Sequence, residues 1–163
     1  MVFKINTNGS GFSVIKDFMD YLEGAYPNGD LLLCGTTLYG TAPNGGNSGW
    51  GTVFKLNTDG SGFAVLKDFT NWTDGAYCYA GLLLSGTTLY GTAYNGGNNG
   101  SGTVFKLETD GSGYTAITHF ARGDGSNPYA SLMLSGSTLY GTAECGGSSG
   151  NGTGSCCWIF HWK

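Results

Sequence analysis

One block of sequence near the start of the chain returns twice at a constant spacing. The segment VFKINTNGSGFSVIKDF at 2–18 returns as VFKLNTDGSGFAVLKDF at 53–69 and as VFKLETDGSGYTAITHF at 104–120, a step of 51 residues each time. A second segment, LCGTTLYGTA at 33–42, also returns twice, and its last copy shows that the third unit is one residue shorter near Arg122. A repeat of about 50 residues is typical of propeller blades and related arrays.

Each unit predicts four short strands. In chain order they are LLLCG (31–35), TTLYGTA (36–42), GTVFKLNT (51–58) and FAVLKDF (63–69), which we call the first to fourth strands of a unit. The first is a continuous apolar run, which is typical of a strand buried on both faces. Cys34 stands there where Ser85 and Ser135 stand in the other copies, so we expect a small buried residue. The Asp-Gly of TDGSG predicts a type I′ hairpin turn between the third and fourth strands.

These signals predict an all-β fold of β-propeller-type blades, each with four antiparallel strands. About three repeats of roughly 51 residues form a single repeat domain over 1–163, with units starting near Val2, Val53 and Val104 and an atypical tail at 154–163. Composition agrees, because 31 glycines and 14% aromatic residues suit short strands and tight turns, whereas disordered chains have few aromatic residues.

Charge and hydropathy exclude several classes of partner. The net charge is −4 and no basic cluster occurs, so we expect no nucleic-acid partner. No apolar run reaches about 18 residues, so we expect no membrane span. Met1 is followed directly by repeat sequence, so we expect no signal peptide in this chain. Five cysteines, an odd number without a C-x-x-C pair, argue against a complete disulfide framework.

The repeated wording GTVFKLNTDGSG, LLLSGTTLYGTA and GG resembles the bacterial GloVer tandem-repeat family over nearly all of 2–153. That resemblance implies a β-propeller-like array in surface or secreted proteins that carry many such units and varied C-terminal anchors. It therefore implies an extracellular or cell-surface location. It implies no defined activity, ligand or catalytic residue.

The order of strands raises the question of closure. The chain begins with a third and a fourth strand and, after two whole units, reaches a first and a second strand. Propellers have about 4–8 blades, so three repeats do not close a ring. Because exposed strand edges pair with other chains, we expect a homo-oligomer in which the end of one chain pairs with the start of the next, and we favour a six-bladed dimer. The rival is a monomeric open fragment.

The tail GTGSCCWIFHWK decides whether the chain completes its own last blade or leaves that position to a neighbouring chain. Gly152 and Thr153 match Gly102 and Thr103, so a third strand is expected to start there, but the sequence that follows is different. The tail either substitutes for the third strand or leaves its place to a neighbouring chain.

The variable loops are the candidate ligand-binding face. In a blade, the loops between second and third strands and between successive units emerge on one side. They carry aromatic and amide groups that suit carbohydrate or protein recognition from a rigid scaffold. The candidate residues are Trp50, Trp72, Asp74, Tyr77, Tyr94 and Asn95. The alternative is that such residues only form turns and cap the core.

No motif predicts catalytic, cofactor or metal-binding residues. Each TDGSG copy offers one carboxylate, Asp59 or Asp110, which favours a turn over a calcium site. His119, which replaces Asp17 and Asp68, is interpreted as structural. The leading hypothesis is therefore a non-enzymatic β-propeller repeat module with a binding or scaffold role.

Two alternatives to that hypothesis stay open. One is a hydrolase or lyase whose carboxylates, such as Glu23, Asp74 and Asp124, converge at a ring centre. The other is a truncated repeat fragment without a function of its own.

Overall fold

The computed structural model describes residues 1–121 and 123–146, and the backbone of 158–161. Its strands form four antiparallel sheets, and a short 3-10 helix, η1 (Tyr21–Glu23), links the first sheet to the second. The strands are β1 (Val2–Lys4) and β2 (Ser13–Lys16); β3 (Leu32–Cys34), β4 (Thr37–Ala42), β5 (Thr52–Asn57) and β6 (Ala64–Asp68); β7 (Leu83–Ser85), β8 (Thr88–Ala93), β9 (Thr103–Glu108) and β10 (Thr115–His119); and β11 (Met133–Ser135), β12 (Thr138–Ala143) and β13 (Trp158–His161).

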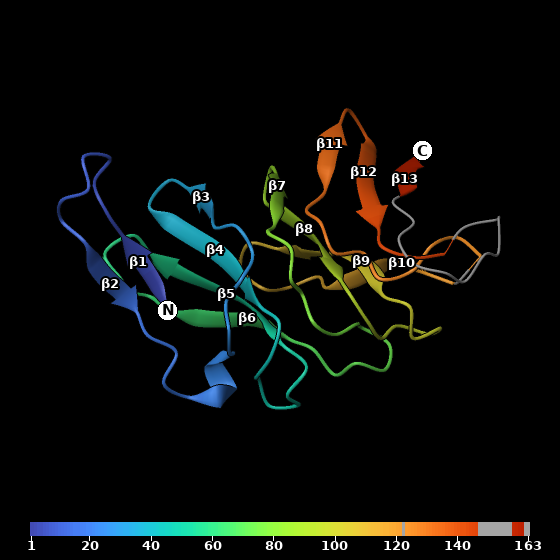
Figure 1. The fold of residues 1–163 in the computed structure, drawn as a ribbon, viewed down its shortest axis with the longest axis horizontal. Helices are drawn as coiled ribbons and strands as arrows, with labels where there is room; N and C mark the ends of the chain where they lie inside the picture. Colours follow the sequence, from blue (N-terminus) through green and yellow to red (C-terminus); the bar gives the residue numbers. More distant parts are fainter. Residues whose placement is uncertain (122, 147–157, 162–163) are drawn as a thin grey trace.

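The sheets follow one another in chain order, and the first and last lie at opposite ends of the molecule (Figure 1). Two of them are complete four-stranded blades, β3–β6 and β7–β10, in which spatial order equals chain order. They are flanked by the pair β1–β2 and by the three-stranded last sheet, β11–β13. The prediction of an all-β fold with four-stranded antiparallel blades is confirmed.

The register within each blade explains the glycine of the TLYGTA strands. Gly40 lies opposite Phe54 across β4 and β5, and Gly91 lies opposite Phe105 across β8 and β9. A Cβ atom on Gly40 would stand 2.6 Å from the ring of Phe54, and one on Gly91 would stand 2.5 Å from the ring of Phe105. Glycine is required at both positions because the phenylalanine ring lies directly over the glycine backbone and leaves no room for a side chain.

Three aromatic rings join β1–β2 to the first complete blade. Phe18, which follows β2, meets Phe54 of β5 edge to face with ring centroids 5.1 Å apart, and meets Phe63 at 5.8 Å. Phe54 and Phe63 are 6.0 Å apart. The Nζ atom of Lys16 lies 4.3 Å from the centroid of the Phe63 ring. Edge-to-face pairs of this kind contribute about 0.5–1.5 kcal/mol beyond their buried area.

The same arrangement joins the two complete blades. Phe69 meets Phe105 at 5.3 Å and Tyr114 at 6.0 Å, and the last two rings are 5.8 Å apart. Lys67 places its Nζ atom 4.8 Å from the centroid of Tyr114. Each of these two junctions therefore contains one ring from the preceding fourth strand and two from the following blade. We call this set of three rings the aromatic triad.

The tail substitutes for a third strand, as one of the two alternatives anticipated. Ala143 lies opposite Trp158 in β13, where Ala93 lies opposite Thr103 in the second blade. The described part of this strand begins at Trp158, and the expected start at Gly152 and Thr153 lies outside the described residues.

Two local predictions are also wrong. Leu33 and Cys34 are exposed, because the first strand of each blade is the edge strand of its sheet and one side faces solvent. The turn at Asp59 is not type I′, since positive φ among the described non-glycine residues occurs only at Tyr26, Asn71, Tyr77 and Asn127. The Asp59 carboxylate instead accepts hydrogen bonds from the backbone and hydroxyl of Ser61 at 2.9 and 2.7 Å.

The packing of the phenylalanine ring against the opposite glycine can be tested by adding one methyl group at that glycine. Gly91→Ala should lower the free energy of unfolding by about 1–3 kcal/mol, because the new Cβ overpacks against Phe105. Gly123→Ala is the matched control, since Gly123 has open space around it. Urea denaturation followed by tryptophan fluorescence measures both. Equal stability of the two variants would contradict this account of the register.

Candidate functional site

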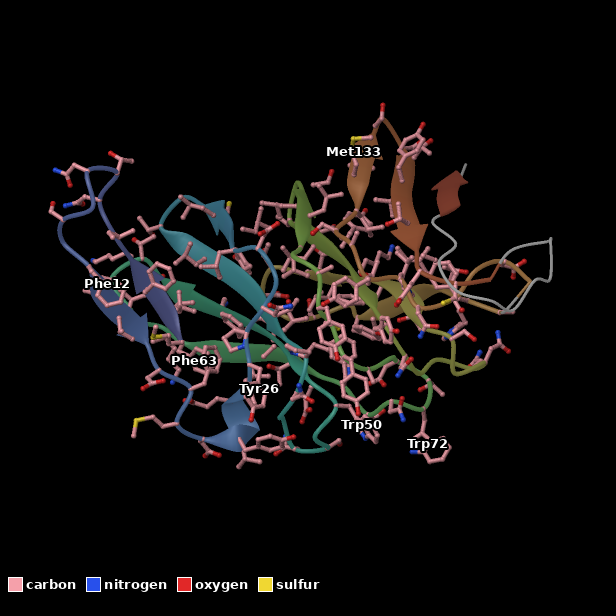
Figure 2. All side chains as sticks on the ribbon, viewed as in Figure 1. Phe12, Tyr26, Trp50, Phe63, Trp72 and Met133 are labelled. Atoms are coloured by element: carbon pink, nitrogen blue, oxygen red, sulfur yellow. The ribbon has the colours of Figure 1, made fainter. Side chains whose placement is uncertain are left out.

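The two classes of variable loop lie together on one face of the molecule. In each unit the loop before the first strand forms a β-bridge with the loop after the second strand, at Ala25–Asn44, Ala76–Asn95 and Ser126–Cys145. Figure 2 shows Tyr26, Trp50 and Trp72 along the edge of the molecule where these loops emerge, opposite the edge that carries Met133. We call this edge the loop face.

Five aromatic side chains form a continuous chain of ring contacts on the loop face. Trp50 meets Tyr77 edge to face at 5.3 Å, and Tyr77 lies stacked 6.4 Å from Tyr79. Tyr79 stacks on Tyr129 at 5.0 Å, and Tyr94 meets both Tyr79 and Tyr129 edge to face at 5.6 and 6.0 Å. These rings all come from connecting loops: Trp50 lies between β4 and β5, Tyr77 and Tyr79 between β6 and β7, Tyr94 between β8 and β9, and Tyr129 between β10 and β11. We call Trp50, Tyr77, Tyr79, Tyr94 and Tyr129 the aromatic ridge.

The backbone that carries the ridge is held in a sparsely populated conformation. Tyr26, Tyr77 and Asn127 occupy the same position of each unit with φ of 57, 59 and 61°. Asparagine tolerates this left-handed region, whereas a bulky tyrosine is an outlier there. The backbone N–H of Tyr77 donates to Trp50 O at 2.9 Å, which ties the conformation to the preceding blade. Such strain persists where surrounding structure over-determines it, and it concentrates at functional sites.

Polar groups border the ridge on the side of the last sheet. The hydroxyl of Tyr94 donates to Glu144 Oε2 at 2.8 Å, and this bond, with burial, raises the pKa of Tyr94 to about 12. Asn127 Nδ2 donates to Asn95 Oδ1 at 2.8 Å and to Tyr94 O at 3.2 Å. Burial, and secondarily the neighbouring Tyr129, raises the pKa of Tyr79. The tyrosines therefore stay neutral hydrogen-bonding groups at ordinary pH.

The structure brings together four of the six residues that the sequence singled out. Trp50, Tyr77 and Tyr94 belong to the ridge, and Asn95 borders it through Asn127. Trp72 projects from the loop face in Figure 2, and its side chain is 81% exposed. It has no ring contact among those found in the described part of the chain.

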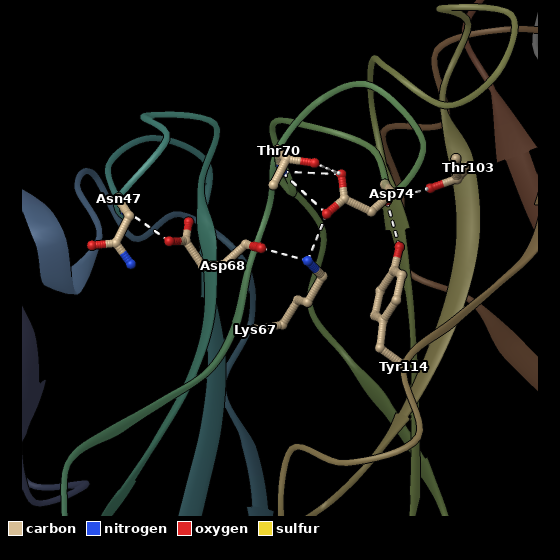
Figure 3. Close-up of polar contacts among 7 residues, drawn as sticks. All are labelled: Asn47, Lys67, Asp68, Thr70, Asp74, Thr103 and Tyr114. Carbon is tan, nitrogen blue, oxygen red and sulfur yellow. Dashed lines mark hydrogen bonds and ion pairs between the residues drawn. The ribbon is translucent and has the colours of Figure 1, made fainter.

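Asp74, the sixth residue, serves the scaffold. It is 8% exposed and its Oδ2 atom lies 2.6 Å from Lys67 Nζ (Figure 3). The same carboxylate accepts from the backbone N–H of Thr70 at 3.0 Å and from its hydroxyl at 2.9 Å, while the backbone oxygen accepts from Tyr114 and Thr103. Its charge is fully engaged, so it does not form part of the ridge.

His119 also has a structural role, because it makes the same kind of contact as Asp68 at the equivalent position of the preceding blade. The backbone N–H of Asn47 donates to Asp68 Oδ2 at 2.8 Å, and that of Asn98 donates to His119 Nδ1 at 3.2 Å (Figure 3 shows the first). Both contacts fix the glycine-rich loop after the second strand. His119 is therefore an acceptor for its own loop in this structure.

The remaining carboxylates are held at separate places. Glu23 pairs with Lys16 at 2.6 Å, as Asp74 pairs with Lys67. Hydrogen bonds from Ser61 and Ser112 lower the pKa of Asp59 and Asp110 in the turns. In the part of the chain that the structure describes, no cluster of three or more His, Cys, Asp or Glu side chains could hold a metal ion. None of its helices is long and apolar enough to cross a membrane.

Comparison with known families identifies the repeat. The model of the Gloeobacter/Verrucomicrobia repeat matches residues 1–154. The chain therefore belongs to this repeat family, which confirms the resemblance seen in the repeated segments. No curated protein matches the chain.

Comparison with solved structures supports the architecture. A chain of the crystal structure of a nidogen/laminin complex is similar over 86% of this protein, with a TM-score of 0.60 and 15% sequence identity. This protein covers 46% of that chain, or about half its length. At this identity the similarity shows the fold alone, which is that of a β-propeller.

Sequence reasoning did not single out Tyr79, Tyr129, Asn127 and Glu144. Tyr79 and Tyr129 hold the same position in successive units, where the first unit has Asn28. Equivalent positions of adjacent blades lie side by side, so this spacing was the signal that could have found the stacked pair.

The scaffold role of Asp74 predicts a large loss of stability. Asp74→Asn should lower the free energy of unfolding by about 3 kcal/mol, because it leaves Lys67 largely buried without its counter-charge. Asp124 occupies the equivalent position in the third unit and is exposed, and Thr118 stands at the position equivalent to Lys67. Asp124→Asn should therefore change stability by less than about 0.5 kcal/mol. Thermal and urea unfolding measure both, and a comparable loss in the control would contradict the role.

The Tyr94–Glu144 hydrogen bond predicts an alkaline transition. A pKa raised to about 12 in the folded state means that the bond stabilises the fold below pH about 10 and is lost as pH rises toward 12. Glu144→Gln should bring the Tyr94 pKa down toward 10, as followed by NMR of ring-labelled tyrosine. Glu108→Gln, away from the ridge, should leave it unchanged. An unaltered Tyr94 titration in Glu144→Gln would refute the contact.

Proposed function

We propose that this propeller-type repeat module is a non-enzymatic binding protein that takes neutral carbohydrate on its aromatic ridge. The observation that carries the proposal is the unbroken chain of ring contacts from Trp50 to Tyr129 on the loop face. It is supported by the position of the ridge on loops over a rigid β scaffold, where binding residues concentrate.

The chemistry of the ridge suits a sugar. The C–H faces of a pyranose ring are apolar and pack against aromatic rings, while its hydroxyl groups need donors and acceptors at the rim. Tyrosine supplies both in one side chain. Tyr129 is half exposed, and the hydrogen-bonded amide groups of Asn95 and Asn127 lie on the loops that carry Tyr94 and Tyr129. Amides and phenols both donate and accept, which matches a hydroxyl-rich ligand.

The electrostatics of the ridge favour an uncharged ligand. Its bordering carboxylate, Glu144, already accepts a hydrogen bond from Tyr94. The cation–ring contacts found among the described residues are those of Lys16 and Lys67, and none of them involves a ring of the ridge. An acidic sugar would find no counter-charge there, so neutral hexose oligomers are the preferred class. The resemblance to surface and secreted repeat proteins supports a site of action outside the cell.

A non-enzymatic role is supported by the carboxylates as well. The hydrolase alternative needs Glu23, Asp74 and Asp124 to converge. Glu23 and Asp74 each pair with a different lysine, and each pair lies at a different junction between sheets. Glycosidase chemistry needs two carboxyl groups within roughly 5–10 Å of one scissile bond.

A glycan array followed by titration calorimetry tests the proposal. We expect binding to neutral oligosaccharides, weakened at least about tenfold by Tyr129→Ala and by Tyr79→Ala, since each removes a stacking ring. Trp72→Ala is the control for a large exposed aromatic outside the ridge and should bind normally. Silence on the array, or dependence on Trp72 alone, would contradict the proposal. Capture of a protein ligand through the ridge in the absence of glycan binding would replace carbohydrate by protein as the ligand.

A further inference from the structure

The first sheet, β1–β2, already has the conformation of the second half of a complete blade. β1 and β2 pair in the same register as β5 and β6, with the same shift of register just before the phenylalanine of the third strand. The ring centroids of Phe3 and Phe12 are 5.6 Å apart at an interplanar angle of 35°, against 6.0 Å and 33° for the equivalent rings of Phe54 and Phe63. The two strands therefore take this form without a first and a second strand beside them.

The apolar side chains of this sheet are exposed where their equivalents are buried. Phe3 and Ile5 are each 51% exposed, and Phe12 is 56% exposed. The residues equivalent to Phe3 and Ile5 in the first complete blade are Phe54 and Leu56, and both are fully buried. Apolar groups that are exposed together in this way favour association with a covering element.

A backbone donor at the end of β1 lacks the acceptor that its equivalents have. The N–H of Thr58 donates to Thr36 O at 2.9 Å in the first complete blade. In the second, the N–H of Thr109 donates to Thr87 O at 2.8 Å, and both acceptors lie in the turn between the first and second strands. Thr7 holds the equivalent position, and its N–H makes no such bond within the described residues.

The outward edge of β1 is thus a sheet edge with unpaired main-chain groups. Among the described strands, β1 pairs with β2 alone. Edges of this kind are templates for the addition of a further strand, in which main-chain hydrogen bonds supply affinity and the side-chain pattern supplies specificity.

The two complete blades show which element covers this edge. The strand TLYGTA pairs with β5 as β4 and with β9 as β8, and its glycine lies opposite the phenylalanine each time. The leucine run before it covers the same place, because Leu82 and Phe105 both lie over Gly91, within 3.0 and 2.5 Å of where its Cβ would stand. The element that fits β1 is therefore a hairpin with the sequence LLLSGTTLYGTA, as in residues 82–93.

The donor of this hairpin differs from a folded second copy of the chain. Each TLYGTA strand here already has a neighbour on both sides: β4 lies between β3 and β5, β8 between β7 and β9, and β12 between β11 and β13. The matching partner is a molecule with the same repeat in which a first and a second strand have no third strand beside them.

We propose that the edge of β1 binds such an LLLSGTTLYGTA hairpin from another repeat-bearing molecule, which supplies the first two strands of the blade. In this register the glycine of TLYGTA lies opposite Phe3, as Gly91 lies opposite Phe105. Its leucine lies opposite Ile5, and the oxygen of the turn threonine accepts from the N–H of Thr7. The receiving pair of strands is preformed, so binding orders little of this chain.

A synthetic peptide tests the interaction. The peptide has the sequence of residues 82–93 with lysines added at its end for solubility, and we expect saturable binding to the full chain in titration calorimetry. Phe3→Ala in the chain should weaken binding at least about tenfold, because it removes the ring that packs on the peptide glycine. Trp72→Ala, a matched change at an exposed ring on the loop face, should leave binding unchanged.

Two results would overturn the proposal. One is the absence of peptide binding, or binding that is equally strong in Phe3→Ala. The other is a dimer of the chain that forms as concentration rises, that Phe3→Ala abolishes and that the peptide does not dissociate. That result would assign the edge of β1 to a second copy of the chain.

A change within the peptide tests the register. Gly91→Val in the peptide should weaken binding at least about tenfold, because its side chain overlaps the ring of Phe3. Valine favours strands more than glycine does, so a loss of strand propensity does not account for that result. The altered peptide should bind the Phe3→Ala chain better than the unaltered chain, because the smaller side chain leaves room for valine. Equal binding of the two peptides to the unaltered chain would refute the register.

Hydrogen exchange locates the bound peptide independently of affinity. Saturation with the unaltered peptide should slow exchange of the Thr7 N–H, which gains an acceptor in the peptide turn. The N–H of Thr58, which already donates to Thr36 O, should exchange at an unchanged rate and is the control. Bound peptide with no change at Thr7 would contradict docking on the edge of β1.

Discussion

The structure depends on one recurring contact, a phenylalanine ring from the end of one sheet held between two rings of the next. Phe18 and Phe69 make this contact at the two complete junctions with nearly the same distances. Each pair of rings adds about 0.5–1.5 kcal/mol beyond burial, and the buried phenylalanines themselves contribute several kcal/mol through their area. Neighbouring sheets are thereby fixed to one another, as in other repeat proteins where stability is a sum of nearest-neighbour terms.

The contact also explains why certain residues recur at the same position of each repeat. The ring of Phe54 or Phe105 needs a glycine opposite it, and the lysine of the fourth strand spans the junction with its ammonium group over Phe63 or Tyr114. In two of the units that ammonium group then meets a carboxylate, Glu23 or Asp74, at 2.6 Å. Ring packing, strand register and the ion pair thus occur together at the same junction between sheets. The loops on the loop face take no part in these contacts, so their sequences can vary. The aromatic ridge occupies those loops.

Strand number, strand order and the propeller architecture could be predicted because they follow from the repeat of about 51 residues and from the strand and turn patterns within each copy. The ridge could be predicted only in part. Trp50, Tyr77 and Tyr94 were found as aromatic residues in variable loops, but the same criterion selected Trp72 and Asp74, because sequence does not show which loop residues face each other. Asp74 was misassigned since its partner, Lys67, meets it only through the return of the loop onto the fourth strand. Exposure of Cys34 and the start of β13 at Trp158 depend on edge position and pairing, which local patterns do not encode.

Hydrogen exchange measured residue by residue tests the central claim that aromatic triads hold successive sheets together. The account predicts strong protection of β5 and β9, whose phenylalanines are fully buried, at every concentration. It predicts weaker protection of β1 and β2, where Phe3 and Phe12 are exposed. Protection of β1 and β2 equal to that of β5 and β9 would contradict the account.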